Sequence, residues 1–195
     1  MKAILKSTVV IAFMFATVVS MAKEKKSYSL VTVKDENLIF RLENISEETT
    51  IKLLDSDSNV IYSEKLVGQS DYAKNFDFKN LESGVYFLKA ENILTSTEYI
   101  INIKNDDVTI VDEKVINKPF FNRTEGKLYV TLLNESLENV DVIVYNVDGD
   151  LVFEETSKEL KIQKIFNFEK AYGDKFTVLV KDNNSSYYNE FVIEK

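Results

Sequence analysis

Residues 75–92, "NFDFKNLESGVYFLKAEN", decide the fold because they hold two alternating apolar runs joined by a turn. In "NFDF" and "VYFLKA" an apolar side chain recurs at every second position, which is the period of a half-buried β-strand. The intervening Leu-Glu-Ser-Gly supplies turn residues, and we expect Gly84 to adopt a positive φ there. The residues that we expect on one buried face are Phe76, Phe78, Tyr86 and Leu88.

The same alternation continues along most of the chain. It recurs in "SLVTVK", "LIFRLEN", "TIKLLD", "NVIYSEKL" and "YIINIK", and short polar groups such as "KDEN" and "DSDSN" separate the runs. The only proline is Pro119, so the strands are not interrupted. Short strands at this spacing predict an all-β fold of antiparallel β-sandwiches.

A weaker copy of the opening stretch, "IFNFEKAYGDKFTVLVKD", occupies residues 165–182. A shift of 90 residues places Leu38 on Leu128 and Phe76 on Phe166, with apolar positions kept in phase. In the hairpin region one inserted residue makes the shift 91. A repeat that keeps both phase and turn order over a domain length indicates a duplication.

The duplication predicts two tandem β-sandwich domains, residues 23–105 and a diverged repeat over residues 106–195. "DDVTIVDEKVIN" (residues 106–117) is expected to supply the first strand of the second copy. No Gly/Ser-rich linker lies between the copies, which favours a stiff tandem.

The N-terminal residues 1–22 are interpreted as a signal peptide. A basic start, "MKAILK", precedes the apolar run "STVVIAFMFATVVSMA", and small residues at its end suit cleavage after Ala22. The alternative is a retained membrane anchor, although the run is short for a span of roughly 20 residues. We therefore expect an extracytoplasmic protein with no stable membrane span after cleavage.

The composition argues against most enzyme classes. The chain has no cysteine and no histidine, so thiol nucleophiles, Ser-His-Asp triads, disulfides and Cys-ligated metals are all excluded. The formal charge of −8 disfavours nucleic acid as a partner. We predict a protein that is not an enzyme and that has no cofactor and no metal.

Two acidic loops, "DSDSN" and "NVDGD", resemble parts of a calcium-binding loop. Such a loop needs oxygen ligands at positions 1, 3 and 5, glycine at 6 and glutamate at 12. The first loop has Val60 in place of the glycine, and the second has Val144 at the first position. Both loops suit hairpin turns, with Gly149 supplying positive φ in the second.

Tyr187 and Tyr188 follow the polar group "NNSS" and are the candidate interaction residues. Two exposed rings would form an aromatic platform for a sugar or a protein. On a strand, however, consecutive side chains point to opposite faces, which favours one ring inward and one outward.

The first copy resembles the C-terminal sorting domain of type IX secretion cargo proteins in Gram-negative bacteria. Residues 50–104 carry the resemblance: "TIKLLDSDSNVIYSEKL" is similar to the family's hairpin, and "YIINIK" to its closing strand. The spacing of Leu81 and Gly84-Val85-Tyr86 is the more specific match. The second copy keeps the hairpin, "VIVYNVDGDLVFEE", but reads "KAYGDKF" in place of the leucine–glycine spacing. The resemblance implies an Ig-like β-sandwich.

These observations predict a secreted or periplasmic, non-enzymatic protein that interacts with a protein or another component of a Gram-negative cell envelope. One alternative is a stand-alone sorting module linked to type IX secretion. Another is a carbohydrate-binding module that uses the tyrosine pair. The sequence does not choose between periplasm, outer surface and medium.

Overall fold

The computed structural model describes residues 28–34, 37–45, 47–105, 107–169, 171 and 174–193. These residues form fifteen β-strands and no helix, so none of them belongs to a helix able to cross a membrane. Every strand pair whose register is defined is antiparallel. The all-β prediction is confirmed, whereas the signal peptide predicted over residues 1–22 lies outside the described residues.

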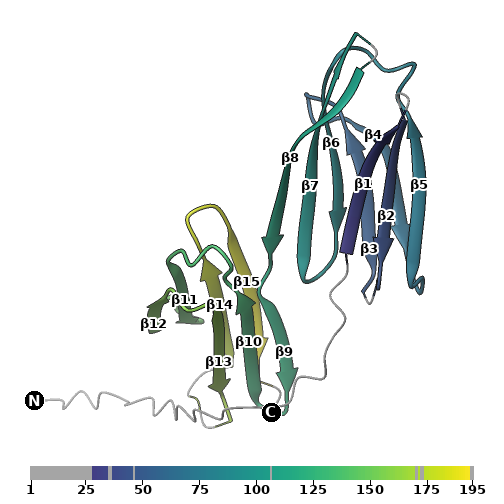
Figure 1. Ribbon diagram of the computed structural model, residues 1–195. Helices are drawn as coiled ribbons and strands as arrows, with labels where there is room; N and C mark the ends of the chain where they lie inside the picture. The colour runs from purple at the N-terminus through teal and green to yellow at the C-terminus, as the bar shows by residue number, and fades with distance from the viewer. Residues whose placement is uncertain are drawn as a thin grey trace, which may run out of the picture. The chain divides into compact units, whose positions relative to one another are not determined.

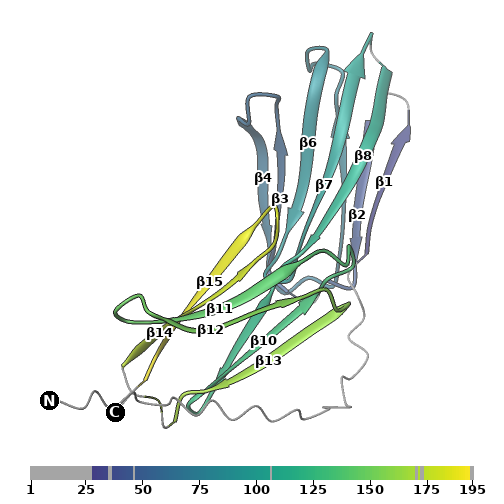
Figure 2. The same ribbon diagram turned by 90° about the vertical axis from the view of Figure 1, so that its left-hand side faces the viewer.

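The first sandwich is built from two sheets. One has the order β1-β2-β5 and the other β4-β3-β6-β7-β8, as Figures 1 and 2 show. The strands are β1 (Tyr28–Lys34), β2 (Asn37–Glu43), β3 (Thr49–Leu54), β4 (Val60–Leu66), β5 (Asp71–Asp77), β6 (Gly84–Glu91), β7 (Thr95–Lys104) and β8 (Asp107–Asn117).

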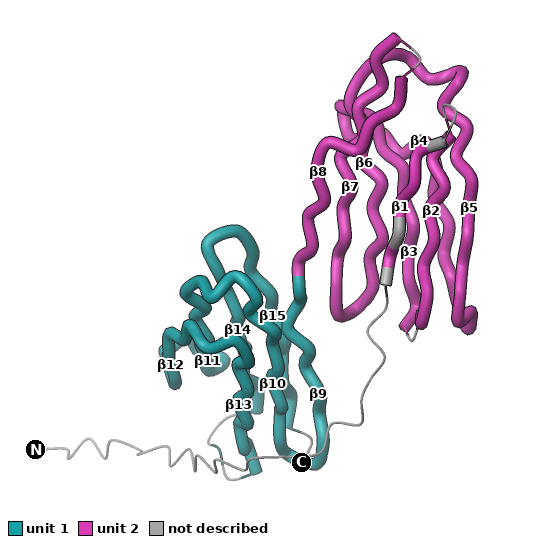
Figure 3. The backbone as a smooth tube through the Cα atoms, viewed as in Figure 1, with its two compact units in different colours: residues 1–17, 117–195 teal, residues 18–116 magenta. Residues whose placement is uncertain are grey.

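The second sandwich has the sheet orders β13-β10-β9 and β12-β11-β14-β15. Its strands are β9 (Phe120–Thr124), β10 (Lys127–Leu133), β11 (Val140–Asn146), β12 (Leu151–Ser157), β13 (Lys161–Asn167), β14 (Lys175–Lys181) and β15 (Ser186–Val192). Figure 3 colours the two compact units, which divide between residues 116 and 117.

Each sandwich closes over its own apolar core, to which both sheets contribute. In the first, Phe40 and Ile101 come from different sheets and are fully buried. In the second, Leu128 and Val178 likewise come from different sheets and are fully buried. Alternation along the strands produces these cores, because every second side chain points inward. Phe76, Phe78, Tyr86 and Leu88 all point into this one core, as predicted, although β5 and β6, which position them, lie in different sheets.

The two sandwiches have the same strand order over seven strands, with β1–β7 corresponding to β9–β15. The registers agree as well: Leu38 pairs with Phe76, and Leu128 pairs with Phe166, 90 residues further along in each case. A bulge interrupts β3–β4 after Leu53, and another interrupts β11–β12 at the equivalent place. This three-plus-four arrangement is that of an Ig-like sandwich. The agreement supports our proposal that the second domain is a diverged repeat of the first.

The strand β8 is placed differently from the expectation. We expected residues 106–117 to open the second copy, but β8 lies beside β7 in the first sandwich. Asn105 has a φ of 51°, which lets the chain reverse directly after β7, and Val108 then enters the first core. The domain ranges 23–105 and 106–195 stay a proposal, with β8 belonging to the first sheet by its pairing.

The two acidic loops are matching hairpin turns, as predicted. In the first, the Asp55 carboxylate accepts the backbone N–H groups of Asp57 and Asn59. In the second, Asn146 Oδ1 accepts those of Asp148 and Asp150. Gly149 has a φ of 82°, as expected for this turn. The expectation for Gly84 was wrong: it starts β6 as an extended residue, so its φ is not positive.

Candidate interaction surface

The predicted site residues Tyr187 and Tyr188 lie on β15, where they point to opposite faces of the sheet. Tyr188 is 67% exposed, whereas Tyr187 is half-buried on the side of the core. They pair with neighbouring residues of β14, Val180 and Leu179. The structure therefore does not bring the two rings together into one platform, and only Tyr188 presents its ring on the outer face.

Tyr188 is the exposed end of a row of apolar side chains that runs across three strands. Ile143 of β11 pairs with Leu179 of β14, which pairs with Tyr188 of β15. We call Ile143, Leu179 and Tyr188 the apolar row. Ile143 and Leu179 are only 3% and 8% exposed, yet they alternate with core residues such as Val142 and so face away from the core.

Charged groups flank the apolar row on the same face. On one side Lys181 Nζ lies 3.5 Å from Asp141 Oδ2, and the Thr156 hydroxyl donates to Asp141 Oδ1 at 2.6 Å. On the other side Lys175 Nζ lies 2.7 Å from Glu190 Oε1. An apolar centre with a polar rim is the usual make-up of a protein interface.

The first copy has charged residues at the equivalent positions. Lys52, Lys89 and Glu98 pair across β3, β6 and β7 in the same register as the apolar row. Lys89 Nζ and Glu98 Oε2 form an ion pair of 2.6 Å. Because the two sandwiches share their strand order, the apolar row is a property of the second copy and not a requirement of the fold.

The strand β15 is held in place from the opposite sheet. The guanidinium of Arg123, on β9, donates to Asn189 Oδ1 at 3.0 Å and to the carbonyl of Glu190. The same group lies 5.8 Å from the centre of the Phe191 ring. These contacts fix the strand that presents Tyr188, so the outer face is preorganised rather than formed on binding.

Sequence reasoning missed Ile143 and Leu179. The signal that could have found them is local: "VDVIVYN" and "KFTVLVK" each contain three consecutive apolar residues, which breaks the period of two. Such continuous runs indicate a strand that is buried on both faces. Because we treated these runs as alternating strands, we did not predict that β11 and β14 also have apolar residues on their outer face.

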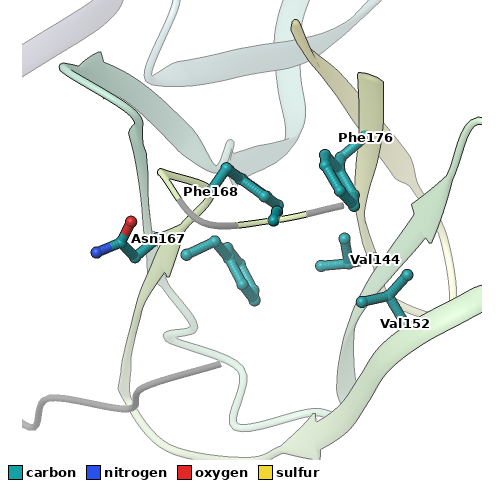
Figure 4. A pocket seen from close by; sticks show the side chains of 7 residues that line it. Val144, Val152, Asn167, Phe168 and Phe176 are labelled. Carbon is teal, nitrogen blue, oxygen red and sulfur yellow. The ribbon is translucent and has the colours of Figure 1, made fainter. Parts of the chain in front are cut away.

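A small cavity opens within the second core and does not extend the surface site. Figure 4 shows the side chains around it, among them Val144, Val152, Asn167, Phe168 and Phe176. Its space is about 10 Å³, which holds at most one water molecule. The aromatic and aliphatic lining consists mainly of core residues, so the cavity is a packing defect and not a ligand pocket.

A cluster of polar residues joins the edge strands β4 and β5 of the first copy. The hydroxyls of Tyr62 and Tyr72 both donate to Glu64 Oε2, the second at 2.6 Å. These hydrogen bonds lower the pKa of Glu64, that from Tyr62 most, while burial and then the bond to Glu64 raise the pKa of Tyr72. Lys74 Nζ lies 4.2 Å from the centre of the Tyr62 ring. The donors and acceptors satisfy one another, and the cluster links the two sheets of the first sandwich. We call such a polar link between sheets a clasp.

No metal-binding group of three acidic side chains occurs among the described residues. In the first loop, the Asp55 carboxylate that a cation would need is occupied by the turn, since Oδ2 accepts the Asn59 amide at 2.9 Å. The bonds from Asn59 and Asp57 lower the pKa of Asp55. In this part of the chain the acidic loops act as turns.

Residues 34–104 match the model of a protein family described as "Secretion system C-terminal sorting domain". The match lies within the first copy and includes residues 50–104, which carried the resemblance in the sequence, so that resemblance is confirmed. A search of curated proteins found no match.

Solved structures similar to the chain are β-sandwich proteins of low identity. One is the BSP domain of a biofilm-associated protein (8% identity, TM-score 0.29), which aligns with 85% of this chain, although the chain spans only 29% of that protein. Another is a segment of two fibronectin type-III domains from chicken tenascin (10% identity, TM-score 0.26, 86% of this chain and 98% of that one). At these TM-scores the fold assignment rests on the strand order described above.

Proposed function

We propose that this chain is an extracytoplasmic, non-enzymatic protein whose two sandwiches serve interaction or scaffolding at the bacterial cell envelope. The sorting-domain match over residues 34–104 supports the compartment, because that family is defined by secretion. The ring of Tyr188, which is the exposed end of the apolar row, supports the interaction role, and it is the observation that carries the proposal. Its partner is a protein or another envelope component.

The second copy is the copy that binds. Both copies use the same core and the same turns, so the fold does not require Leu179 and Tyr188 on the outer face when Lys89 and Glu98 serve there in the first copy. Tyrosine is enriched at the centre of interfaces, where it buries a large ring and keeps a polar tip. The neighbouring ion pairs would form the wet rim of such an interface.

The test gives the outer face of the second copy a residue that the first copy has at the equivalent position. The variant Y188E places the acidic residue of the first copy, Glu98, at the equivalent position of the second copy and is expected to keep the fold, because Tyr188 is 67% exposed. Co-sedimentation with washed envelopes of the native host measures binding. We expect the bound fraction to fall by about tenfold or more, as for the loss of an interface hot spot. The matched control, K89A/E98A, alters the first copy and should bind normally.

Equal losses in both variants, or no loss in either, would contradict the assignment of binding to the apolar row. Carbohydrate recognition is distinguished in the same assay. If Tyr188 binds a glycan, Tyr188→Phe retains the ring and most of the binding, and enzymatic removal of envelope glycans abolishes it. If the partner is a protein, protease treatment of the envelopes abolishes binding instead.

A second candidate function is that of a stand-alone sorting module linked to type IX secretion, favoured by the family match itself. A reporter placed ahead of residues 23–195 tests it in a host with an active type IX apparatus and in a strain that lacks the apparatus. The sorting role predicts a reporter on the surface or in the medium of the first strain only. Equal release from both strains would rule the role out.

A further inference from the structure

The strand β8 presents an open edge of the first sandwich. It ends the order β4-β3-β6-β7-β8, and among the described residues β7 is its only neighbour in the sheet. Residues 109–115 are all exposed, including three β-branched apolar residues: Ile110 (37%), Val111 (63%) and Val115 (46%). A long edge strand with exposed apolar side chains is a template for pairing with another strand.

The sequence of β8 is complementary to itself when it is read in the antiparallel direction. With Glu113 opposite its own copy, Asp112 faces Lys114 of the second strand and Val111 faces Val115. One step further out, Ile110 faces Ile116. A two-fold axis through Glu113 repeats each of these pairs, so the register contains two opposite-charge pairs, four apolar pairs and one like-charge pair, that of Glu113 with its own copy.

We propose that β8 pairs antiparallel with β8 of a second copy of this chain, in the register centred on Glu113. The pairing joins two five-stranded sheets edge to edge. It satisfies the open β8 edge of both copies at once and brings the exposed apolar side chains of the two β8 strands into contact. This self-association is a property of the first copy and does not rest on the apolar row of the second.

The charges select this register over its neighbours. A shift by one residue in one direction places Asp112 opposite Glu113, and both one-residue shifts turn the side chains to the wrong faces. A shift by two loses both Asp112–Lys114 pairs and places either Asp112 or Lys114 opposite its own copy. Like charges directly opposite each other are destabilising. Parallel pairing in register would place every charge opposite its own kind.

The charged residues of β8 are available for this pairing. Asp112 Oδ1 accepts the backbone N–H of Glu113 at 2.8 Å, which leaves Oδ2 for a cation. Lys114 makes no hydrogen bond or ion pair within the part of the chain that the structure describes, and it is exposed. The side chain of Glu113 is hydrogen-bonded with Tyr99 of its own sheet, which holds the one like-charge pair away from the axis.

Charge reversal tests the register. The protein is purified from its host in its processed form, and sedimentation analysis over a range of concentrations measures its oligomeric state. We expect a monomer–dimer equilibrium for the wild type. D112K carries Lys at both 112 and 114, K114D carries Asp at both, and each should dimerise at least about tenfold more weakly, since like charges now face each other.

Two further samples separate this register from a folding defect. An equimolar mixture of D112K and K114D restores both opposite-charge pairs and should form a heterodimer, although each variant alone is monomeric. The double variant D112K/K114D restores the pairs within one chain and should dimerise like the wild type. A wild type that stays monomeric at every concentration overturns the proposal. So does a mixture that fails to form heterodimers, or a K114D chain that dimerises normally.

Discussion

The two sandwiches place the same contacts in their cores. In the first copy the Phe76 ring lies 5.4 Å from Tyr62, edge to face, and stacks 6.4 Å from Phe78. In the second, the Phe166 ring lies 5.4 Å from Phe153, edge to face, and stacks 6.3 Å from Phe168. The two copies have few identical residues, yet these ring geometries agree, because close packing between two sheets allows few alternatives.

The turns agree by a different route, with the chemistry exchanged between positions. In the first hairpin the Asn59 amide donates to the Asp55 carboxylate, and in the second the Asn146 amide donates to the Asp150 carboxylate. The donor and the acceptor have changed places, and the turn is the same. What the copies preserve is the hydrogen bonding of the backbone, not the identity of the residue that provides it.

The copies differ most on their outer faces. Lys89 and Glu98 form an ion pair in the first copy where Leu179 and Tyr188 lie in the second. The exchange leaves both cores unchanged, because all four side chains lie on the outer faces of their sheets. The difference teaches that the fold determines the core and the turns, whereas the outer face is free to take up a separate role in each copy.

The largest effect should come from removing one of the equivalent phenylalanines. Phe76→Ala and Phe166→Ala each delete a buried ring, and each should destabilise its own sandwich by about 3–5 kcal/mol. Urea unfolding should then show two transitions. Phe76→Ala moves only the transition of the first copy, and Phe166→Ala only that of the second.

Unfolding in one transition that both variants shift equally would show that the sandwiches fold as a single cooperative unit. In that case the tandem-domain proposal would fail, even though the strand order is repeated. The conservative variants Phe76→Leu and Phe166→Leu serve as controls, because they leave a smaller cavity and should give smaller shifts of the same transitions.

A smaller effect follows from exchanging the residues with positive φ in the two hairpins. Ser58 has a φ of 66°, which is unfavourable for a side chain, and Gly149 has a φ of 82° with open space around its Cβ position. We expect Gly149→Ser to destabilise the second copy by about 1–2 kcal/mol and Ser58→Gly to stabilise the first by up to about 1 kcal/mol. Thermal unfolding of both variants measures this. Shifts of the same sign would contradict the equivalence of the turns.

Much of the fold could be predicted from the sequence, because alternation is a local consequence of burial. A period of two marked the strands, and the burial of Phe76, Phe78, Tyr86 and Leu88 in one core followed from it. The hairpin at Gly149 followed from its turn residues. The repeat was visible because phase and turn order survive when identities change.

The placement of β8 could not be predicted in the same way. The apolar residues of β8 suit a strand in either sandwich. The chain reversal at Asn105 pairs β8 with β7, and no recognisable turn motif in the sequence predicts that reversal. The apolar row was missed for a related reason. Tyr188 was identified by its aromatic ring, but Ile143 and Leu179 join it only through the pairing of three strands. Cross-strand neighbours are a tertiary property, so a single segment does not contain them.

The smallest predicted effect concerns the polar links between sheets, which join β4 to β5 in the first copy and β12 to β13 in the second. In the first copy Glu64 accepts hydrogen bonds from two tyrosines, whereas in the second Glu155 pairs with Lys164 at 2.5 Å. The bonds from Tyr62 and Tyr72 hold the pKa of Glu64 below its ordinary value of 4.5 in the folded state. A lowered pKa stabilises the fold above that ordinary value, and the stabilisation is lost as the pH falls through the folded pKa.

Glu64→Gln should therefore destabilise the first copy at neutral pH by less than about 1 kcal/mol, because the carboxylate is partly solvent-screened. The difference from the wild type should be smaller at an acidic pH below the ordinary value of 4.5, where the wild-type carboxylate is itself being protonated, than at neutral pH. Urea unfolding at both pH values measures it. Tyr72→Phe removes one donor and should leave a weaker dependence on pH, so it separates the hydrogen bonds from the charge. If Glu64→Gln costs the same at both pH values, the tyrosines do not stabilise the ionised carboxylate, and the clasp acts by packing alone.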